Sequence, residues 1–309
     1  MQKLTTLGKV SDIVDVLSRN CVDKMIPARE ITFDNLNTVR IANEPFALRD
    51  MAQLSFAYRL GIPLQYLKRC PPEIQKYNLD HWITKEKNEE LLFRFDGNDV
   101  RVVFTPRYTP VDNFEILERL DSLGYGPDTE VQCSVDHEFM MLNIPEGKAF
   151  TVNGDKMRPG LSLSNSEVGI AALSISAFIL RLVCTNGMIS STHVAEKYKH
   201  ISRRILDEFP EVLGRVSNEL ASQKNRFLLS LNSKVAHPEN TIKSLNRQFA
   251  LGKVEQEAVE WAWPQEAGDT MFHIVNTYTR AAQFENLPSE SAYTLQKTGG
   301  NILAMVKEE

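Results

Sequence analysis

Three polar clusters interrupt the apolar pattern of this chain and hold its candidate functional side chains. The first cluster combines Arg101 with residues 105–113, in which Arg107 and Tyr108 directly follow a strand-like segment. A guanidinium pairs with phosphate or carboxylate through two parallel hydrogen bonds, and a tyrosine ring stacks on a nucleobase. The cluster is therefore a candidate nucleic-acid contact. The ordinary alternative is a surface arginine, a packed tyrosine and a helix N-cap at Asp112.

The second cluster, residues 159–169, is a dense run of small and polar residues between two apolar segments. Backbone N–H groups and hydroxyls in such a loop can bind an anion. Glu167 is a candidate general base or metal ligand, with Asn165 and Ser166 beside it. Serine and asparagine in loops also bond their own backbone, so a purely structural loop is an equal alternative.

The third cluster, residues 181–188, contains Arg181, Cys184 and Asn186. A cysteine nucleophile needs a paired base, and nothing in the sequence places a histidine against Cys184. A structural cysteine is therefore favoured. The four cysteines of the chain form no C-x-x-C pair, which excludes the common zinc and thioredoxin motifs.

Two further polar stretches have ordinary explanations. A basic segment contains Lys197, Arg203 and Arg204, and it is either a solvated helix face or a surface that follows phosphates. His137 lies between Asp136 and Glu138 in a segment that we expect to be a strand. Adjacent strand residues point to opposite faces, so these three side chains are not expected to form a metal site.

Composition limits the class of protein. Hydrophobic residues make up 42% and charged residues 24%, as in ordinary globular proteins, and the net charge of −5 argues against a uniformly basic nucleic-acid binder. No apolar segment approaches the roughly 20 residues that cross a bilayer, and there is no signal-peptide pattern, so we expect a cytoplasmic protein without membrane contact. The common nucleotide-binding and hydrolase motifs are absent, and no cofactor or metal is indicated.

The pattern of apolar residues and turn signals predicts an α+β fold with a central antiparallel or mixed β-sheet, an N-terminal helical segment and a C-terminal helical region. We expect a core domain over 1–190, helical in 1–90 and β-rich in 91–190, and a helical region over 191–309. The expected elements are helices over 47–60, 113–123, 193–209, 210–231 and 238–251, a hairpin of 91–95 with 100–104, and a strand over 131–144. Residues 172–184 fit a strand or a helix followed by a strand. Breaks are expected in the tail near Pro264, Pro288 and Gly299.

Several motifs occur together in a fixed order. They are Arg59–Pro63 (RLGIP) with Tyr66, Arg107–Asn113 (RYTPVDN), Pro159–Gly169 (PGLSLSNSEVG), Arg181–Met188 (RLVCTNGM) and Asp269–Ala282 (DTMFHIVNTYTRAA). In this order they resemble a family of phage- and plasmid-borne proteins that is catalogued as a domain of unknown function, and the resemblance covers 47–282. One departure is Thr105–Pro106, where much of the family has a Ser-Asp pair. The missing acidic residue weakens the case for a catalytic role of this loop.

The resemblance implies a protein of prophages, plasmids and integrated elements, which often serve recombination, replication or evasion of host defence. The leading hypothesis is a homo-oligomeric accessory protein that binds or anneals single-stranded DNA. The alternatives are a nucleotide- or nucleic-acid-processing enzyme, with Asp112, Asn165 and Glu167 holding a metal or Glu167 acting as base, and an interaction protein such as an inhibitor of host defence. Candidate nucleic-acid contacts are Arg101, Arg107, Tyr108, Arg158, Asn165, Arg181, Lys197, Arg203 and Arg204. A further polar site comprises Asp112, Asn113, Ser166, Glu167, Cys184 and Asn186.

Overall fold

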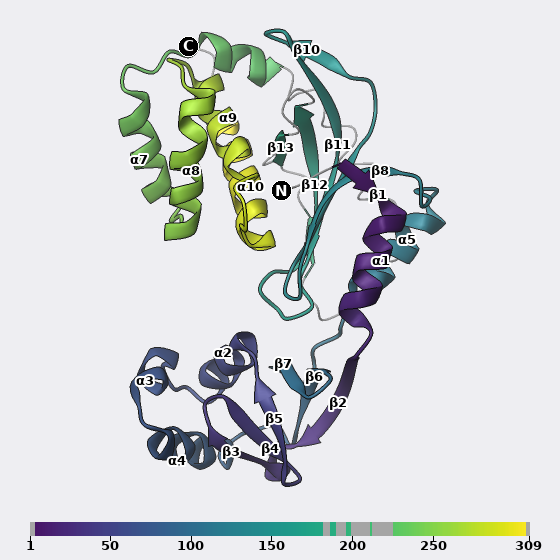
Figure 1. Cartoon of the computed structure of the whole chain (residues 1–309), viewed down its shortest axis with the longest axis vertical. Coiled ribbons are helices and arrows are strands. Elements are labelled where there is room, and N and C mark those ends of the chain that lie inside the picture. The colour runs from purple at the N-terminus through teal and green to yellow at the C-terminus, as the bar shows by residue number, and fades with distance from the viewer. Residues whose placement is uncertain (1–3, 182–185, 190–195, 199–210, 212–224, 307–309) are drawn as a thin grey trace. The chain divides into compact units, whose positions relative to one another are not determined.

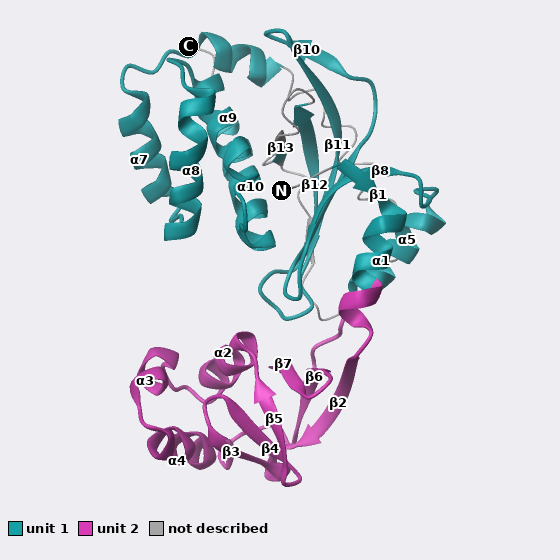
Figure 2. Cartoon of the chain, viewed as in Figure 1, with its two compact units in different colours: residues 1–14, 111–309 teal, residues 15–110 magenta. Residues whose placement is uncertain are grey.

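The computed structural model describes residues 4–181, 186–189, 196–198, 211 and 225–306 (Figure 1). The predicted α+β fold class is confirmed, because helices and two β-sheets are both present. The chain forms two compact units (Figure 2). Unit 1 comprises residues 1–14 and 111–309, and unit 2 comprises residues 15–110. This division differs from the expected boundary near residue 190. Among the described helices, none has the length and apolar character needed to cross a membrane.

Unit 2 is built on a six-stranded sheet in the order β2-β6-β7-β5-β4-β3. Its β5 and β7 are parallel, and all its other neighbouring strands are antiparallel. Its elements are β2 (Cys21–Pro27), η1 (Ala28–Glu30), β3 (Ile31–Asn35), β4 (Thr38–Ile41), β5 (Glu44–Leu48), α2 (Asp50–Arg59), α3 (Leu64–Arg69), α4 (Pro72–Ile83), β6 (Glu90–Asp96) and β7 (Asp99–Phe104).

The sheet of unit 2 must curl. β2 and β3 lie at its opposite edges, yet only the three-residue η1 connects them. A flat six-stranded sheet would separate its edges by about 24 Å, whereas four peptide steps from Pro27 to Ile31 span at most about 14 Å. The curled sheet encloses its own apolar core, which includes Phe33, Phe56 and Phe93.

Local signals explain part of unit 2. The predicted hairpin is confirmed: β6 pairs with β7, and Asp96 lies opposite Asp99. Gly97 supplies a φ of +57° in the loop, and Arg49 binds both flanking carboxylates at 2.7 and 3.0 Å. The expected helix over 47–60 is present as α2.

The helical interpretation of 1–90 is wrong for residues 21–48, which form four strands. Strands β3, β4 and β5 have only four or five residues, and most of β2 is exposed, so none of the four gives a clear alternation of apolar and polar residues.

Helix α4 covers the open edge of β3. The Phe33 backbone N–H donates to the Asp80 carboxylate at 2.8 Å, and Lys76 donates to the Phe33 carbonyl at 2.7 Å. The Leu36 N–H donates to the Gln75 side chain at 2.9 Å. These side chains satisfy edge groups that would otherwise be open to pairing with another chain, and they fix α4 against the sheet.

Unit 1 contains an antiparallel sheet in the order β1-β8-β9-β11-β12-β13, with β10 paired to β11 and β14 paired to β12. Its elements are β1 (Leu4–Thr6), α1 (Leu7–Ser18, whose last residues belong to unit 2), α5 (Asn113–Ser122), β8 (Glu130–Val135), β9 (Met140–Pro145), β10 (Phe150–Val152), β11 (Asp155–Asn165), β12 (Leu173–Arg181), β13 (Asn186–Ile189), β14 (Glu196–Tyr198), α7 (Pro238–Gln248), α8 (Lys253–Glu266), α9 (Met271–Ala281) and α10 (Ser289–Met305).

Helices lie on both sides of this sheet (Figure 1). On one side, α1 and α5 form an apolar core with the sheet, to which Val10, Ile116 and Leu161 contribute. On the other side, α10 makes polar contacts with β8 and β9. The Asn143 amide donates to Gln132 at 3.1 Å and to Gln296 of α10 at 3.0 Å, and all three side chains are fully buried. The sheet is therefore covered on both faces where these helices lie.

Several predictions for unit 1 need correction. Residues 131–144 are not one strand but the hairpin of β8 and β9, because the Asp136 side chain accepts N–H bonds from Glu138 and Phe139 and makes a turn. His137 therefore lies in that turn. Residues 173–181 form a strand, so the strand alternative holds for the described part of 172–184.

The expected helices over 193–209 and 210–231 lie largely outside the described residues, although Glu196–Tyr198 is a strand and 225–232 is helical. In the tail, the expected break at Pro288 is confirmed because α10 begins directly after it. The expected break near Pro264 is also confirmed, because α8 ends two residues later at Glu266 and α9 begins at Met271. The break near Gly299 is wrong, because Gly299 lies inside α10.

Candidate functional site

The first two polar clusters of the sequence meet at the start of α5. The Asn113 backbone N–H donates to Glu167 Oε1 at 2.8 Å. The Asn165 amide donates to Asn113 Oδ1 at 2.9 Å and to the Val111 carbonyl at 3.0 Å. The predicted cap is also confirmed, since Asp112 and Glu115 form a reciprocal capping box. We call Asp112, Asn113, Asn165, Ser166 and Glu167 the α5 junction.

Apart from the half-buried Asp112, the α5 junction is buried, and its side chains bond mainly to the backbone. Asn165 and Ser166 are fully buried, and Glu167 is 8% exposed. Ser166 Oγ donates to the Glu138 carbonyl at 2.7 Å and accepts from the backbone N–H groups of Val168 and Ile170. Within the described residues, no three metal-ligating side chains are grouped closely enough to hold an ion. These hydrogen bonds hold the start of α5 and the loop after β11 in place, so the role of the junction is structural.

Two candidate phosphate contacts are occupied by carboxylates. Arg158 pairs with Glu130 at 3.1 Å near the surface. Arg181 is mostly buried and pairs with Asp155 at 2.8 Å and Glu266 at 2.8 Å. Because Glu266 belongs to α8, Arg181 ties the sheet to the C-terminal helices.

The candidates of unit 2 differ in exposure. Arg101 is only 4% exposed, and its Nη1 donates to Cys21 Sγ at 3.2 Å. The Tyr108 ring is stacked on Phe104, with ring centroids 3.6 Å apart. Arg107 is exposed at the surface. Of these three, Arg107 is the most accessible to a ligand.

The remaining candidates are described in part or not at all. Lys197 lies in β14 and Asn186 lies in β13, but their side chains are outside the described part of the structure. Cys184, Arg203 and Arg204 also lie outside the described residues. The roles predicted for all five stay predictions.

Exposed aromatic side chains lie on α3 and α4 of unit 2, and those of α4 were not among the predicted site residues. Tyr66, Tyr77 and Trp82 have exposed fractions of 47%, 69% and 45%. Tyr77 stacks on His81, with ring centroids 6.2 Å apart and an interplanar angle of 13°. Since Leu79 and Ile83 are the buried residues of α4, the rings at 77 and 81 lie on the opposite side of the helix. The sequence contained one signal for this: Tyr77 and His81 are four residues apart, a spacing that places both rings on the same face of a helix.

Three cations accompany these rings. Lys68 and Arg69 end α3, and Lys85 lies two residues beyond the end of α4; all three are exposed. The side chain of Gln75 in α4 donates to the Leu67 and Cys70 carbonyls at 3.0 Å each, which holds the end of α3 against α4. None of the three cations forms a salt bridge with any residue that the structure describes. We call Tyr66, Lys68, Arg69, Tyr77, Trp82 and Lys85 the aromatic–basic surface.

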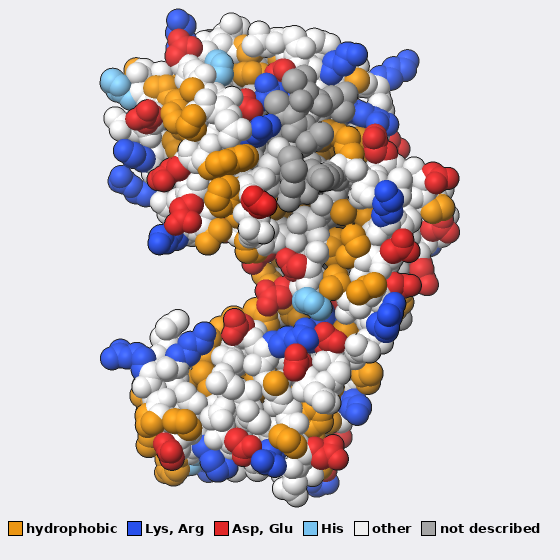
Figure 3. All heavy atoms as spheres, in the orientation of Figure 1, with side chains coloured by type: hydrophobic (Ala, Val, Ile, Leu, Met, Phe, Trp, Pro, Cys, Tyr) orange, Lys and Arg blue, Asp and Glu red, His pale blue; other side chains and the backbone are white. Residues whose placement is uncertain are grey.

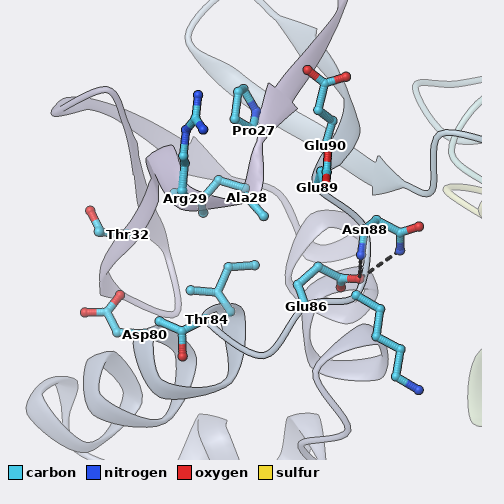
Figure 4. Close-up of a pocket in the computed structure, with 13 residues that line it drawn as sticks. Pro27, Ala28, Arg29, Thr32, Asp80, Thr84, Glu86, Asn88, Glu89 and Glu90 are labelled. Carbon is cyan, nitrogen blue, oxygen red and sulfur yellow. Dashed lines mark hydrogen bonds between the residues drawn. The ribbon is translucent and has the colours of Figure 1, made fainter.

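Unit 2 also contains a groove of about 760 Å³ beside η1 (Figure 4). We call it the η1 groove; it is lined by Pro27, Ala28, Arg29, Ile31, Thr32, Asp80, Ile83, Thr84 and residues 86–90. Glu86 accepts from the backbone and the side chain of Asn88 at 2.9 and 2.8 Å. Burial raises the pKa of Glu86, but the Asn88 hydrogen bonds and the Arg59 charge outweigh it, so the pKa is lowered overall. Glu86 is therefore ionised at neutral pH.

The face shown in Figure 3 carries Lys and Arg interspersed with Asp and Glu rather than one continuous basic area. This agrees with the net charge of −5. Any anion site on this face must therefore be local, formed by a few cations.

Comparison with known proteins identifies one family. No curated protein and no solved structure matches the chain significantly. The family described as "Domain of unknown function (DUF932)" matches residues 102–283. This match includes four of the motifs quoted above in full, and it leaves out Arg59–Pro63 with Tyr66 and the rest of the aromatic–basic surface. The match spans more than half of the chain, and the chain therefore belongs to the DUF932 family, a family of unknown function.

Proposed function

We propose that this protein binds single-stranded nucleic acid through the aromatic–basic surface of unit 2. The observation that carries the proposal is the combination of exposed rings at Tyr66, Tyr77 and Trp82 with cations that no described carboxylate neutralises. Every nucleobase has a face that can stack on an aromatic ring, so such surfaces bind single strands with little sequence preference. Cations beside the rings then meet the phosphates.

The charge distribution supports this location. Unit 2 contains 14 Lys and Arg against 13 Asp and Glu, a net charge of +1, although the whole chain has a net charge of −5. The remaining residues therefore have a net charge of −6. A polyanion is attracted more to unit 2 than to the rest of the chain, and the attraction is concentrated where cations lack acidic partners.

The proposal includes a biological setting. A single-strand binder that promotes annealing in recombination or replication would suit a mobile element, and it would act as a homo-oligomer that covers the strand. Both statements rest on the resemblance of the sequence motifs to phage- and plasmid-borne proteins, and on the stacking surface.

Stacking can be tested with a labelled oligodeoxythymidine of about 20 nucleotides, longer than one binding site of this class. The double variant Tyr77→Leu/Trp82→Leu keeps apolar side chains but removes the rings. We expect the loss to be about 1–3 kcal/mol per stacked base, which is at least about fivefold in Kd by fluorescence anisotropy.

The matched control is Phe114→Leu, which removes an exposed ring from α5 of unit 1. Its Kd should equal that of the unchanged protein. Equal Kd values for the control and for the double variant would refute stacking on α4, and so would a wild-type protein that does not bind the oligonucleotide in low salt.

A further inference from the structure

We infer that strand β2 pairs with β2 of a second copy of this chain, so that the two unit 2 sheets join edge to edge. Strand β2 lies at one edge of its sheet (Figure 1), and β6 is its partner there. The inference makes the homo-oligomer of the proposed function specific and rests on that part of it alone, because the pairing needs no nucleic acid.

The pairing with β6 fixes which backbone groups of β2 face outward. The register is regular from Cys21 to Pro27, and just beyond it the Ala28 N–H donates to the Glu89 carbonyl at 2.8 Å. Bonded and non-bonded residue pairs alternate in an antiparallel ladder, so the even-numbered residues of β2 bond to β6. The backbone N–H and C=O groups of Asp23 and Met25 therefore point away from the sheet, and no residue that the structure describes is bonded to them.

The two edges of this sheet are treated differently. Side chains of α4 bond to the edge groups of β3, as described above. On β2, by contrast, four consecutive residues (22–25) are exposed, and the apolar side chains of Val22 and Met25 are 50% and 42% exposed. An uncovered edge with exposed apolar side chains favours pairing with a further strand.

The charged residues of β2 do not block such an approach. Charges often protect an edge strand from pairing. Here Asp23 forms an ion pair at 2.9 Å with Arg94 of β6, which is only 3% exposed. The Lys24 ammonium lies 5.7 Å from the centre of the Phe95 ring, also on β6. Both charged groups are thus held by side chains of their own sheet, and the edge stays open.

A two-fold axis at Asp23 gives the most favourable register. Each Asp23 N–H then donates to the Asp23 carbonyl of the other copy, and each Met25 N–H donates to the Cys21 carbonyl. Val22 lies opposite the aliphatic stem of Lys24, so both exposed apolar side chains are covered. An axis at Lys24 would instead place two ammonium groups opposite each other. A second copy is the favoured partner because one short segment supplies both halves of this interface, as in an isologous dimer.

Sedimentation of the full chain without DNA tests the inference, and we expect a dimer. Met25→Pro removes an outward N–H, a change that an edge strand tolerates, and Met25→Lys adds a charge at the interface. Each variant should weaken dimerisation at least about tenfold in Kd, and the loss of one hydrogen bond per copy is the reason for Met25→Pro. The control Leu54→Lys changes an apolar residue of α2 that is 44% exposed and should have no effect.

A cross-link tests the register. In Met25→Cys the new thiol lies opposite the native Cys21 of the second copy, at a Cα separation of about 5.5 Å that suits a disulfide. Mild oxidation should therefore give a dimer on a gel that reductant reverses, and the control Leu54→Cys should not.

Three results would overturn the inference. A monomeric wild-type protein would refute the edge pairing together with the proposed homo-oligomer. A dimer that persists in Met25→Pro and Met25→Lys would refute the edge pairing alone, and so would equal cross-linking of Met25→Cys and Leu54→Cys. Oligonucleotide binding is measured separately, so none of these results decides whether the aromatic–basic surface binds nucleic acid.

Discussion

The α5 junction shows what single polar residues do in unit 1. Asn165 donates to two acceptors on the segment that leads into α5, and Glu167 accepts from the first N–H of that helix. A carboxylate at a helix N-terminus is also stabilised by the helix dipole. These contacts assign Asn165 and Glu167 to the support of α5.

Replacing Asn165 tests that assignment. Asn165→Ala leaves the buried Val111 carbonyl and Asn113 Oδ1 without their donor, so we expect the free energy of unfolding to fall by about 1–3 kcal/mol in urea denaturation. The control is Glu118→Ala, an exposed residue of α5, which should change it by less than about 0.5 kcal/mol. If Asn165→Ala leaves stability unchanged, the enzyme alternative for the junction regains support.

Glu290 gives a prediction that depends on pH. Burial raises its pKa, and so do the nearby carboxylates of Glu255, Glu138 and Asp136. A carboxylate whose pKa is higher in the folded state destabilises the fold when ionised, and this cost disappears as the pH falls below the unfolded value of about 4.3. Glu290→Gln should therefore raise Tm at pH 7 and have little effect at pH 4.

The matched control is Glu285→Gln, an exposed residue on the same part of the chain, for which no such difference between the two pH values is expected. Thermal unfolding followed by circular dichroism gives both Tm values. A lower Tm for Glu290→Gln at pH 7 would show that the favourable position of Glu290 in the first turn of α10 outweighs the repulsion.

At the scale of elements, α9 and α10 pack closely through a glycine. A Cβ at Gly299 would lie 2.7 Å from Thr279 Cγ2 and 3.4 Å from the Val275 carbonyl oxygen. Glycine costs about 1 kcal/mol relative to alanine inside a helix. Close approach of the two helices therefore explains why α10 continues through Gly299, where the sequence pattern indicates a break.

Gly299→Ala should lower Tm, because Thr279 must move even though alanine favours the helix. Adding Thr279→Ser removes the clashing methyl and keeps the hydroxyl that donates to Asn276, so the double variant should recover most of the loss. Differential scanning calorimetry measures both. A Gly299→Ala variant that is as stable as the unchanged protein would contradict the close packing of α9 and α10.

Turn residues and helix caps in the sequence predicted those elements whose structure is set by residues close together in the chain. The β6–β7 hairpin follows from its turn residues, and α5 follows from the Asp112 and Glu115 cap. Strands β2 and β5 depend on partners far along the chain, because β2 pairs with β6 and β5 pairs with β7. Strands β3, β4 and β5 also pair with their neighbours in sequence, but they are only four or five residues long and give little periodic signal. The meeting of Asn113 with Glu167 is equally non-local, so the sequence suggested the residues of the junction but not their contacts.

At the scale of the whole molecule, each unit has its own core. The core of unit 2 is formed only by residues between Ile26 and Val103. The two main cores of unit 1 use α1 and α10, both of which lie outside the matched residues 102–283. The family match therefore does not coincide with a folding unit.

Fragments test this division. Residues 15–110 expressed alone should unfold cooperatively, because their core is complete. Residues 102–283 alone should be insoluble or lack a cooperative transition, because the core residues of α1 and α10 are missing. The opposite behaviour of the two fragments would refute the division into units.

The salt dependence of binding to single-stranded DNA tests the proposed function most directly. For single strands the slope of log K against log salt is about −0.7 for each phosphate neutralised. Lys68→Gln/Arg69→Gln/Lys85→Gln should therefore flatten the slope by about 2, while Lys148→Gln/Lys243→Gln/Arg247→Gln, which removes three exposed cations of unit 1, should leave it unchanged. Identical slopes for the two triple variants would contradict binding at the aromatic–basic surface.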